Sequence, residues 1–203
     1  MRRSRSGTSL FLLAAVLGSA GCGDPAAQPT PAAPAPAPET SILVIDFKDP
    51  AAVGWPSVGD SVMGGKSHGA MQSTAEGTAV FGGAISQERG GFVTVRSPSG
   101  SHDLRGFTGM EVRVRGDGKA YQLLVKTDAE EGGVQYFYYF LTREGVWQTW
   151  RLPFEGFRAH YRALPLAGWA RLDPAKVVSM GFLIANWQEG QFRLEIESIK
   201  AYR

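Results

Sequence analysis

The sequence predicts an antiparallel β-sandwich or jelly roll over residues 42–203, and two observations support this fold class. The region holds 22 of the 26 glycines of the 203-residue chain, spaced every few residues as turns between short strands require. Between the glycines lie about ten short apolar or alternating runs, and no long run shows the period of an amphipathic helix. Many short strands at turn spacing are typical of all-β sandwiches.

The predicted strands are justified by their alternation. In residues 109–115, Met110, Val112 and Val114 face one way and charged residues the other, as in a half-buried strand. The sequence Arg-Gly-Asp-Gly-Lys at 115–119 predicts a hairpin turn, and residues 173–176 predict one helical turn. The predicted strands are 42–47, 69–73, 78–86, 91–96, 109–115, 121–127, 134–141, 146–154, 177–185 and 191–202.

Residues 1–21 have the pattern of a signal peptide. Three arginines precede an apolar run at 10–17, which is too short to span a bilayer. Small residues then lead to Cys22, the only cysteine of the chain, and this junction resembles the lipobox of bacterial lipoproteins. Ser19 departs from the usual Leu, and an ordinary secretory signal is the alternative. We expect lipidation of Cys22, which would anchor the domain at the bacterial cell envelope, outside the cytoplasm.

Residues 22–41 are expected to form a tether. They contain six of the 12 prolines, and such a stretch favours extended polyproline II rather than a packed core. Fully extended, the 19 residues after Cys22 would reach roughly 60 Å. The tether is therefore a spacer between the lipid and the domain at 42–203.

Charge and composition exclude several classes of function. The net charge of +2 comes from the arginines of the signal, because residues 23–203 hold 18 basic and 19 acidic residues. No Lys/Arg run remains, so we predict no nucleic-acid partner. One cysteine and three scattered histidines predict neither a disulfide nor a zinc site, and no cofactor is expected. A single Ca²⁺ on loop oxygens stays open.

Two catalytic motifs are matched only in part. Residues 65–69 fit the G-x-S-x-G pattern of a nucleophile elbow around Ser67, but a Gly-rich loop precedes it and a strand-like run follows. Residues 59–67 end like a phosphate loop, yet Asp60 stands where that motif needs glycine. We predict no catalytic residue and no enzyme, with a serine hydrolase using Ser67 as a remote alternative.

The aromatic run at 136–140 suggests a binding surface. Alternation puts Tyr136, Tyr138 and Phe140 on one face and Phe137 and Tyr139 on the other. One face must be core, and the other is either covered or offered to a ligand or protein. The alternatives are a sandwich core with aromatics at its rims and an aromatic platform of the kind that sugar-binding sandwiches use.

Residues 55–67 resemble the opening signature of the complex I intermediate-associated protein 30 family. The segment runs from Trp55 through Asp60 to Val-Met-Gly-Gly-Lys-Ser, which is similar to the family pattern of an aromatic, an Asp and Val-Met-Gly-Gly-x-Ser. Gly59 stands where the family often has Asn. Further similarities follow in order at 81–83, 90–96, 114–121, 147–148, 153–157 and 184–194.

The resemblance implies a galactose-binding-domain-like jelly roll, similar to certain carbohydrate-binding modules. It also implies a non-catalytic, chaperone-like role, because mitochondrial family members assist assembly of respiratory complex I. Our leading hypothesis is an assembly or binding module for a protein partner at the envelope, and a carbohydrate-binding module is the alternative. The family-motif and candidate binding residues are Trp55, Asp60, Met63, Gly64, Gly65, Ser67, Arg96 and Trp187.

The same motif also has a structural interpretation. Gly64 and Gly65 allow positive φ, the side chains of Asp60 and Ser67 can hydrogen-bond the local backbone, and Met63 can plug the core. The sequence leaves the structural and the ligand-binding interpretations open.

Overall fold

The computed structural model describes residues 40–88, 90–128, 133–161, 164–168, 171–185 and 187–203. The predicted signal peptide, Cys22 and nearly all of the predicted tether lie outside the described residues. Within the described part of the chain, no helix has the length and apolar character that a membrane span needs.

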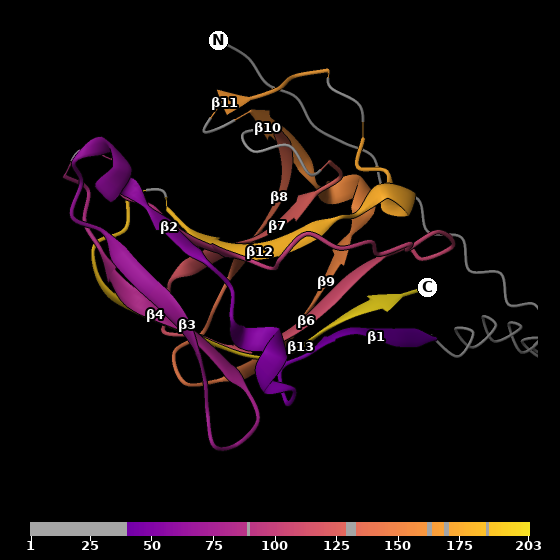
Figure 1. Cartoon of the computed structure of the whole chain (residues 1–203), viewed down its shortest axis with the longest axis horizontal. Helices are drawn as coiled ribbons and strands as arrows, with labels where there is room; N and C mark the ends of the chain where they lie inside the picture. Colours follow the sequence, from indigo (N-terminus) through magenta and orange to yellow (C-terminus); the bar gives the residue numbers. More distant parts are fainter. Residues whose placement is uncertain (1–39, 89, 129–132, 162–163, 169–170, 186) are drawn as a thin grey trace, which may run out of the picture. The chain divides into compact units, whose positions relative to one another are not determined.

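The described chain folds into two antiparallel sheets that face each other (Figure 1). The first has six strands in the order β3-β4-β13-β6-β9, with β1 also pairing with β13; the second has seven, in the order β11-β10-β8-β7-β12-β5-β2. The first sheet comprises β1 (Ser41–Asp46), β3 (His68–Ser73), β4 (Ala79–Ile85), β6 (Gly109–Arg115), β9 (Trp147–Pro153) and β13 (Gly190–Tyr202). The second comprises β2 (Ser57–Gly59), β5 (Val93–Arg96), β7 (Ala120–Lys126), β8 (Val134–Leu141), β10 (Arg158–Tyr161), β11 (Leu164–Pro165) and β12 (Ser179–Ile184).

The core lies between the sheets and follows the predicted alternation. Met110, Val112 and Val114 of β6 are fully buried, and so are Met180 and Phe182 of β12 on the facing sheet. Burial of apolar side chains between two sheets is the main stabilising contribution in such a sandwich. The antiparallel jelly-roll β-sandwich predicted from the sequence is therefore confirmed.

All ten predicted strands are present, and so is the predicted helical turn. That turn is the 3-10 helix η4 (Pro174–Lys176), where the Asp173 carboxylate accepts a hydrogen bond from the backbone N–H of Ala175 at 3.0 Å. The other 3-10 helices are η1 (Pro50–Val53), η2 (Asp60–Met63) and η3 (Phe154–Gly156). The short strands β2, β10 and β11 were not predicted, because two to four residues give too little alternation to detect.

The hairpin predicted at 115–119 is wrong. Strand β6 pairs with β9 and β13, whereas β7 pairs with β8 and β12, so this turn carries the chain from one sheet to the other. The Asp117 carboxylate accepts hydrogen bonds from the backbone N–H groups of Lys119 and Arg193 and from the Tyr121 hydroxyl. A Cβ on Gly116 would lie 2.3 Å from Thr142 Oγ1. Gly and Asp are suited both to a hairpin turn and to a turn that connects two sheets. The local sequence pattern does not distinguish the two.

Candidate functional site

The Asp60 carboxylate is the centre of the family motif. It is fully buried at the start of η2 and accepts three hydrogen bonds: from the backbone N–H of Ser67 at 2.8 Å, from the Ser67 hydroxyl at 2.6 Å and from the backbone N–H of Gly91 at 2.7 Å. We call Asp60, Ser67 and Gly91 the Asp60 clasp. Because its members are up to 31 positions apart, the clasp fixes two loops against each other.

The clasp holds Asp60 in its charged form. Burial alone would raise the pKa of the carboxyl, since it disfavours the charge. The hydrogen bonds from the Ser67 hydroxyl and from the backbone N–H groups of Gly91 and Ser67 outweigh burial and lower the pKa below its ordinary value. A buried, ionised and fully paired carboxylate is a structural anchor rather than an acid or base.

The two motif glycines serve different purposes. Gly64 ends η2 in the left-handed region with φ of 81°, as predicted. The prediction of positive φ is wrong for Gly65. A Cβ there would lie 2.3 Å from the Asp60 Cγ, so glycine is needed for close approach to the carboxylate.

The Ser67 hydroxyl both donates and accepts hydrogen bonds within the protein. It donates to Asp60 and accepts a hydrogen bond from the backbone N–H of Ser86 at 3.0 Å, and the side chain is 1% exposed. Strand β3 begins at the next residue, where a nucleophile elbow has a helix. This arrangement does not present a nucleophile to a substrate, so it gives the hydrolase alternative no support.

Met63 and Trp187 are exposed beside the clasp. Met63 is 58% exposed, so the prediction that it plugs the core is wrong; its Cε lies next to Gly90 instead. Trp187 is 87% exposed, and its carbonyl accepts a hydrogen bond from the Gln87 side-chain amide. Both residues therefore flank the loop that Gly91 ties to Asp60. We call Met63, Gln87, Gly90 and Trp187 the loop end.

Trp187 also has an unusual backbone. Its φ of 59° is the only positive value among the described non-glycine residues. A bulky residue in this region is strained, and such strain is found most often at binding and active sites. An apolar side chain of this size, held open on a strained backbone, is a candidate anchor for a partner.

Two predicted site residues lie elsewhere. Trp55 is buried in the core between Phe47 and Phe182, with ring centroids 5.4 and 6.2 Å away. Arg96 ends β5, whereas the backbone N–H of Asp60 bonds the carbonyl of Phe92, just before β5 begins. The structure thus gathers Asp60, Gly65 and Ser67 in one cluster and Met63 and Trp187 at the loop end, and separates Trp55 and Arg96 from both.

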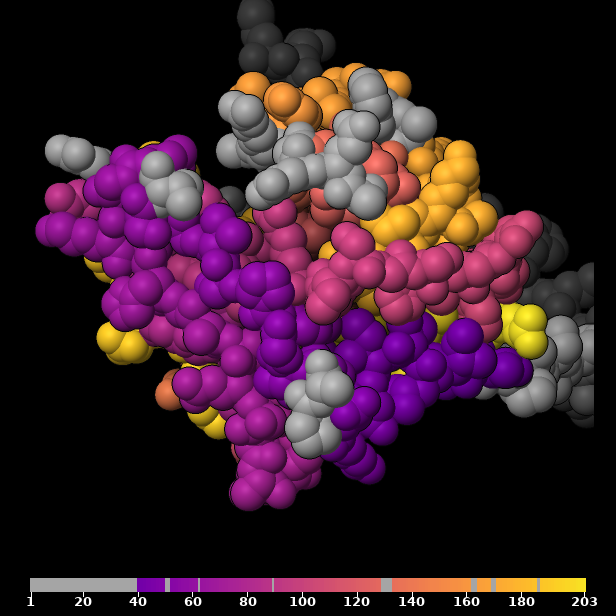
Figure 2. All heavy atoms as spheres, viewed as in Figure 1, coloured from indigo at the N-terminus to yellow at the C-terminus, as the bar shows by residue number. Residues whose placement is uncertain are grey.

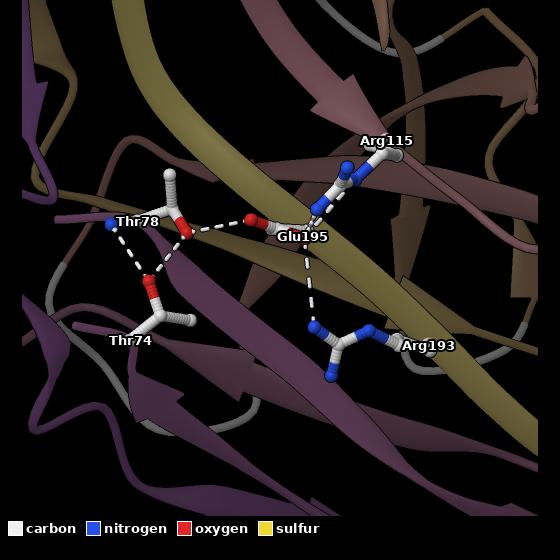
Figure 3. Close-up of polar contacts among 5 residues, drawn as sticks. All are labelled: Thr74, Thr78, Arg115, Arg193 and Glu195. Atoms are coloured by element: carbon white, nitrogen blue, oxygen red, sulfur yellow. Dashed lines mark hydrogen bonds and ion pairs between the residues drawn. The ribbon is translucent and has the colours of Figure 1, made fainter. Parts of the chain in front are cut away.

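Sequence reasoning missed a charged cluster on the outer face of the six-stranded sheet (Figure 3). The Glu195 carboxylate is nearly buried and accepts hydrogen bonds from the Thr78 hydroxyl at 2.8 Å and from Arg115 at 2.6 Å, and Arg193 lies 3.5 Å away. Burial would raise the pKa of Glu195, but the hydrogen bonds from Arg115 and Thr78 and the arginine charges lower it. The cluster ties β13 to β6 and to the loop before β4, which is a structural task.

The outer face of the seven-stranded sheet carries a different surface. Its two edges, around β2 and around β10–β11, stand on either side of a hollow in the molecular outline (Figure 2). As predicted, Phe137 and Tyr139 point to this face, while Tyr136 and Phe140 join the core. Among the described residues, no group of three or more His, Cys, Asp or Glu side chains could hold a metal ion there or elsewhere.

Comparison with known proteins establishes the family. Residues 45–196 match the family described as Complex I intermediate-associated protein 30. The chain belongs to this family. It is 28% identical over 171 residues to Complex I intermediate-associated protein 30, mitochondrial, of Mus musculus, covering 73% of the chain and 52% of the relative. The Drosophila melanogaster protein of the same name is 25% identical over 186 residues, with 80% and 63% covered. The chain thus matches about half to three fifths of the length of these curated relatives.

The fold is shared with carbohydrate-binding modules. A family 11 module of the cellulosomal cellulase Lic26A-Cel5E of Clostridium thermocellum superposes with a TM-score of 0.60 at 19% identity, over 80% of this chain and 94% of the module. A family 11 module from the same organism, in complex with a β-1,3-1,4-mixed-linked tetrasaccharide, gives 0.58 at 18% identity, over 79% and 94%. Identities this low show likeness of fold.

Proposed function

We propose that this protein is a non-catalytic, chaperone-like assembly module that binds a protein partner at the bacterial cell envelope. The observation that carries the proposal is the loop end. Trp187 and Met63 are exposed beside the loop that Gly91 ties to Asp60 of the family motif. The names of the relatives, intermediate-associated proteins of complex I, support a task of holding a protein during assembly.

The proposal places the module on a lipid anchor at Cys22, followed by the proline-rich tether. Its support is the sequence of residues 1–41, with a signal-peptide pattern and the lone cysteine at its end. A domain outside the cytoplasm would meet envelope proteins. The proposed partner is therefore an envelope protein and not a subunit on the matrix-like side of complex I.

Replacing Trp187 with alanine tests the binding surface. We expect recovery of the partner from detergent-solubilised membranes to fall at least about 30-fold, because a central Trp anchor contributes about 2 kcal/mol or more to an interface. The melting temperature should hardly change, since the side chain is 87% exposed. Quantitative affinity purification and a thermal melt measure the two effects.

Leu164→Ala is the matched control, because Leu164 is another exposed apolar side chain, on β11. It should retain every partner that the wild-type protein retains. Equal recovery of the same proteins by Trp187→Ala would rule out the loop end as the docking surface.

A second candidate function is carbohydrate binding. Two observations favour it: the likeness of fold to carbohydrate-binding modules and the recessed outer face of the seven-stranded sheet, which carries Phe137 and Tyr139. Calorimetric titration with a β-1,3-1,4-mixed-linked tetrasaccharide tests this function directly, and measurable binding with saturation is the expected result.

A further inference from the structure

A continuous row of side chains crosses five strands on the outer face of the seven-stranded sheet. The strand registers pair Val58 with Thr94, Thr94 with Leu183, Leu183 with Gln122, and Gln122 with Tyr139. Residues paired in antiparallel register point to the same face. We call these five residues the cross-strand row.

The side chains at the two ends of the row are exposed, and those in its middle are buried. Val58 and Tyr139 are 40% and 47% exposed, whereas Thr94 and Gln122 between them are only 1% and 3% exposed. At about 4.8 Å between neighbouring strands, the distance from Thr94 on β5 to Tyr139 on β8 is roughly 14 Å. The row is therefore longer than a single sugar ring.

One polar group in the middle of the row lacks a partner. Within the described part of the chain, the Thr94 hydroxyl is fully buried and makes no hydrogen bond. Gln122 in the row and Gln135 on the same face are also nearly buried, at 3% and 6% exposed. A buried hydroxyl without a partner is costly and calls for an explanation.

A ligand with many hydroxyl groups supplies the partner that the Thr94 hydroxyl lacks. A threonine hydroxyl and a glutamine amide each both donate and accept, which matches a sugar hydroxyl better than it matches an anion or a cation. The row itself carries no charged side chain, and Tyr139 offers an exposed ring at one end. A neutral, linear ligand lying across the strands satisfies all three features.

We propose that the cross-strand row is the binding site of a neutral linear glycan, which lies across β5, β12, β7 and β8. The proposal rests on the second candidate function, carbohydrate binding, and is independent of the loop end. Thr94 and Gln122 hydrogen-bond the sugar hydroxyls, and Tyr139 packs against a sugar ring.

Thr94→Val and Gln122→Leu test the site, because each removes the polar group at nearly constant shape. Affinity for the β-1,3-1,4-mixed-linked tetrasaccharide should fall about tenfold or more with each change, measured by calorimetry. The melting temperature of Thr94→Val should rise by about 2–4 °C, since an unpaired buried polar group is removed. A group that merely supports the fold would give the opposite change in melting temperature.

Thr149→Val is the matched control, because Thr149 is exposed on β9 of the other sheet. It should change neither affinity nor melting temperature. If the wild-type protein binds the tetrasaccharide and both row variants bind it equally well, the site is wrong and carbohydrate binding stands. If the wild-type protein does not bind it, both the site and the second candidate function are wrong. A fall in melting temperature for Thr94→Val would also overturn the site, because the hydroxyl would then have a structural partner.

Discussion

Replacing Asp60 with alanine is expected to lower the free energy of unfolding by about 3–5 kcal/mol, the largest loss of stability among the changes considered. The carboxylate is fully buried, and its removal leaves the backbone N–H groups of Ser67 and Gly91 and the Ser67 hydroxyl without their acceptor. A cavity is left beside Gly65 as well. Urea denaturation followed by circular dichroism measures the loss as a lower midpoint.

Asp103→Ala is the control for this change. Asp103 also accepts a hydrogen bond from a nearby backbone N–H, that of Arg105, but on an exposed loop. Exposed pairs contribute little, so its denaturation midpoint should stay close to that of the wild-type protein. A denaturation midpoint for Asp60→Ala that also stays unchanged, together with lost partner binding, would contradict the structural role and favour direct contact with a ligand.

The Asp60 clasp also predicts how stability depends on pH. Because the pKa of Asp60 is lower in the folded protein than in the unfolded chain, the ionised form stabilises the fold. This contribution is fully present above the unfolded pKa of about 4 and is lost as the pH falls through the lower folded pKa. Acid titration of the wild-type protein should therefore show a loss of stability in this range that Asp60→Ala largely lacks.

The fold could be predicted because strand alternation is a local property. Met110, Val112 and Val114 lie two positions apart, so their shared face follows from the chain itself. The partner of a strand is not local. The sequence predicts a hairpin turn at 115–119, yet β6 and β7 lie in different sheets. Turn chemistry gives the position of a reversal, whereas packing decides which sheet receives the next strand.

The candidate site shows the same limit. The hydrogen bond between Asp60 and Ser67, seven positions apart, was within reach of sequence reasoning, but the one from Gly91 was not, because its donor comes from a distant loop. The cross-strand row is even harder to predict from the sequence. Thr94 and Gln122 are brought to one line by the registers of three strands, and no spacing in the chain encodes that line.

The two proposed functions are assigned to two different surfaces, the loop end for protein binding and the cross-strand row for glycan binding. The loop end depends on the Asp60 clasp, since Gly91 and Ser86 connect the clasp to Gln87 and so to Trp187. The cross-strand row depends on sheet pairing alone. A variant that loosens the clasp without unfolding the sandwich should therefore weaken protein binding and leave glycan binding intact, so the two functions can be tested in one molecule.

Replacing Cys22 with serine is expected to move the protein from the membrane fraction to the soluble fraction almost completely. Serine keeps the size of the side chain but removes the thiol that lipidation requires. Acyl chains stabilise membrane binding by roughly 0.8 kcal/mol per buried methylene group, so two or more chains anchor a protein stably and their loss abolishes the anchor. Cell fractionation with immunodetection measures the shift.

Thr30→Ser in the tether is the matched control and should remain in the membrane fraction. Intact mass and labelling with a fatty-acid probe make the result decisive, because an uncleaved residue 1–21 segment could itself adhere to membranes. The expected Cys22→Ser protein is soluble and unlabelled. A variant that has lost residues 1–21, carries no fatty acid and still sediments with membranes after a high-salt wash would show that the anchor lies elsewhere. In that case the module would be held at the envelope by its partner, and Trp187→Ala in the same background should then release it.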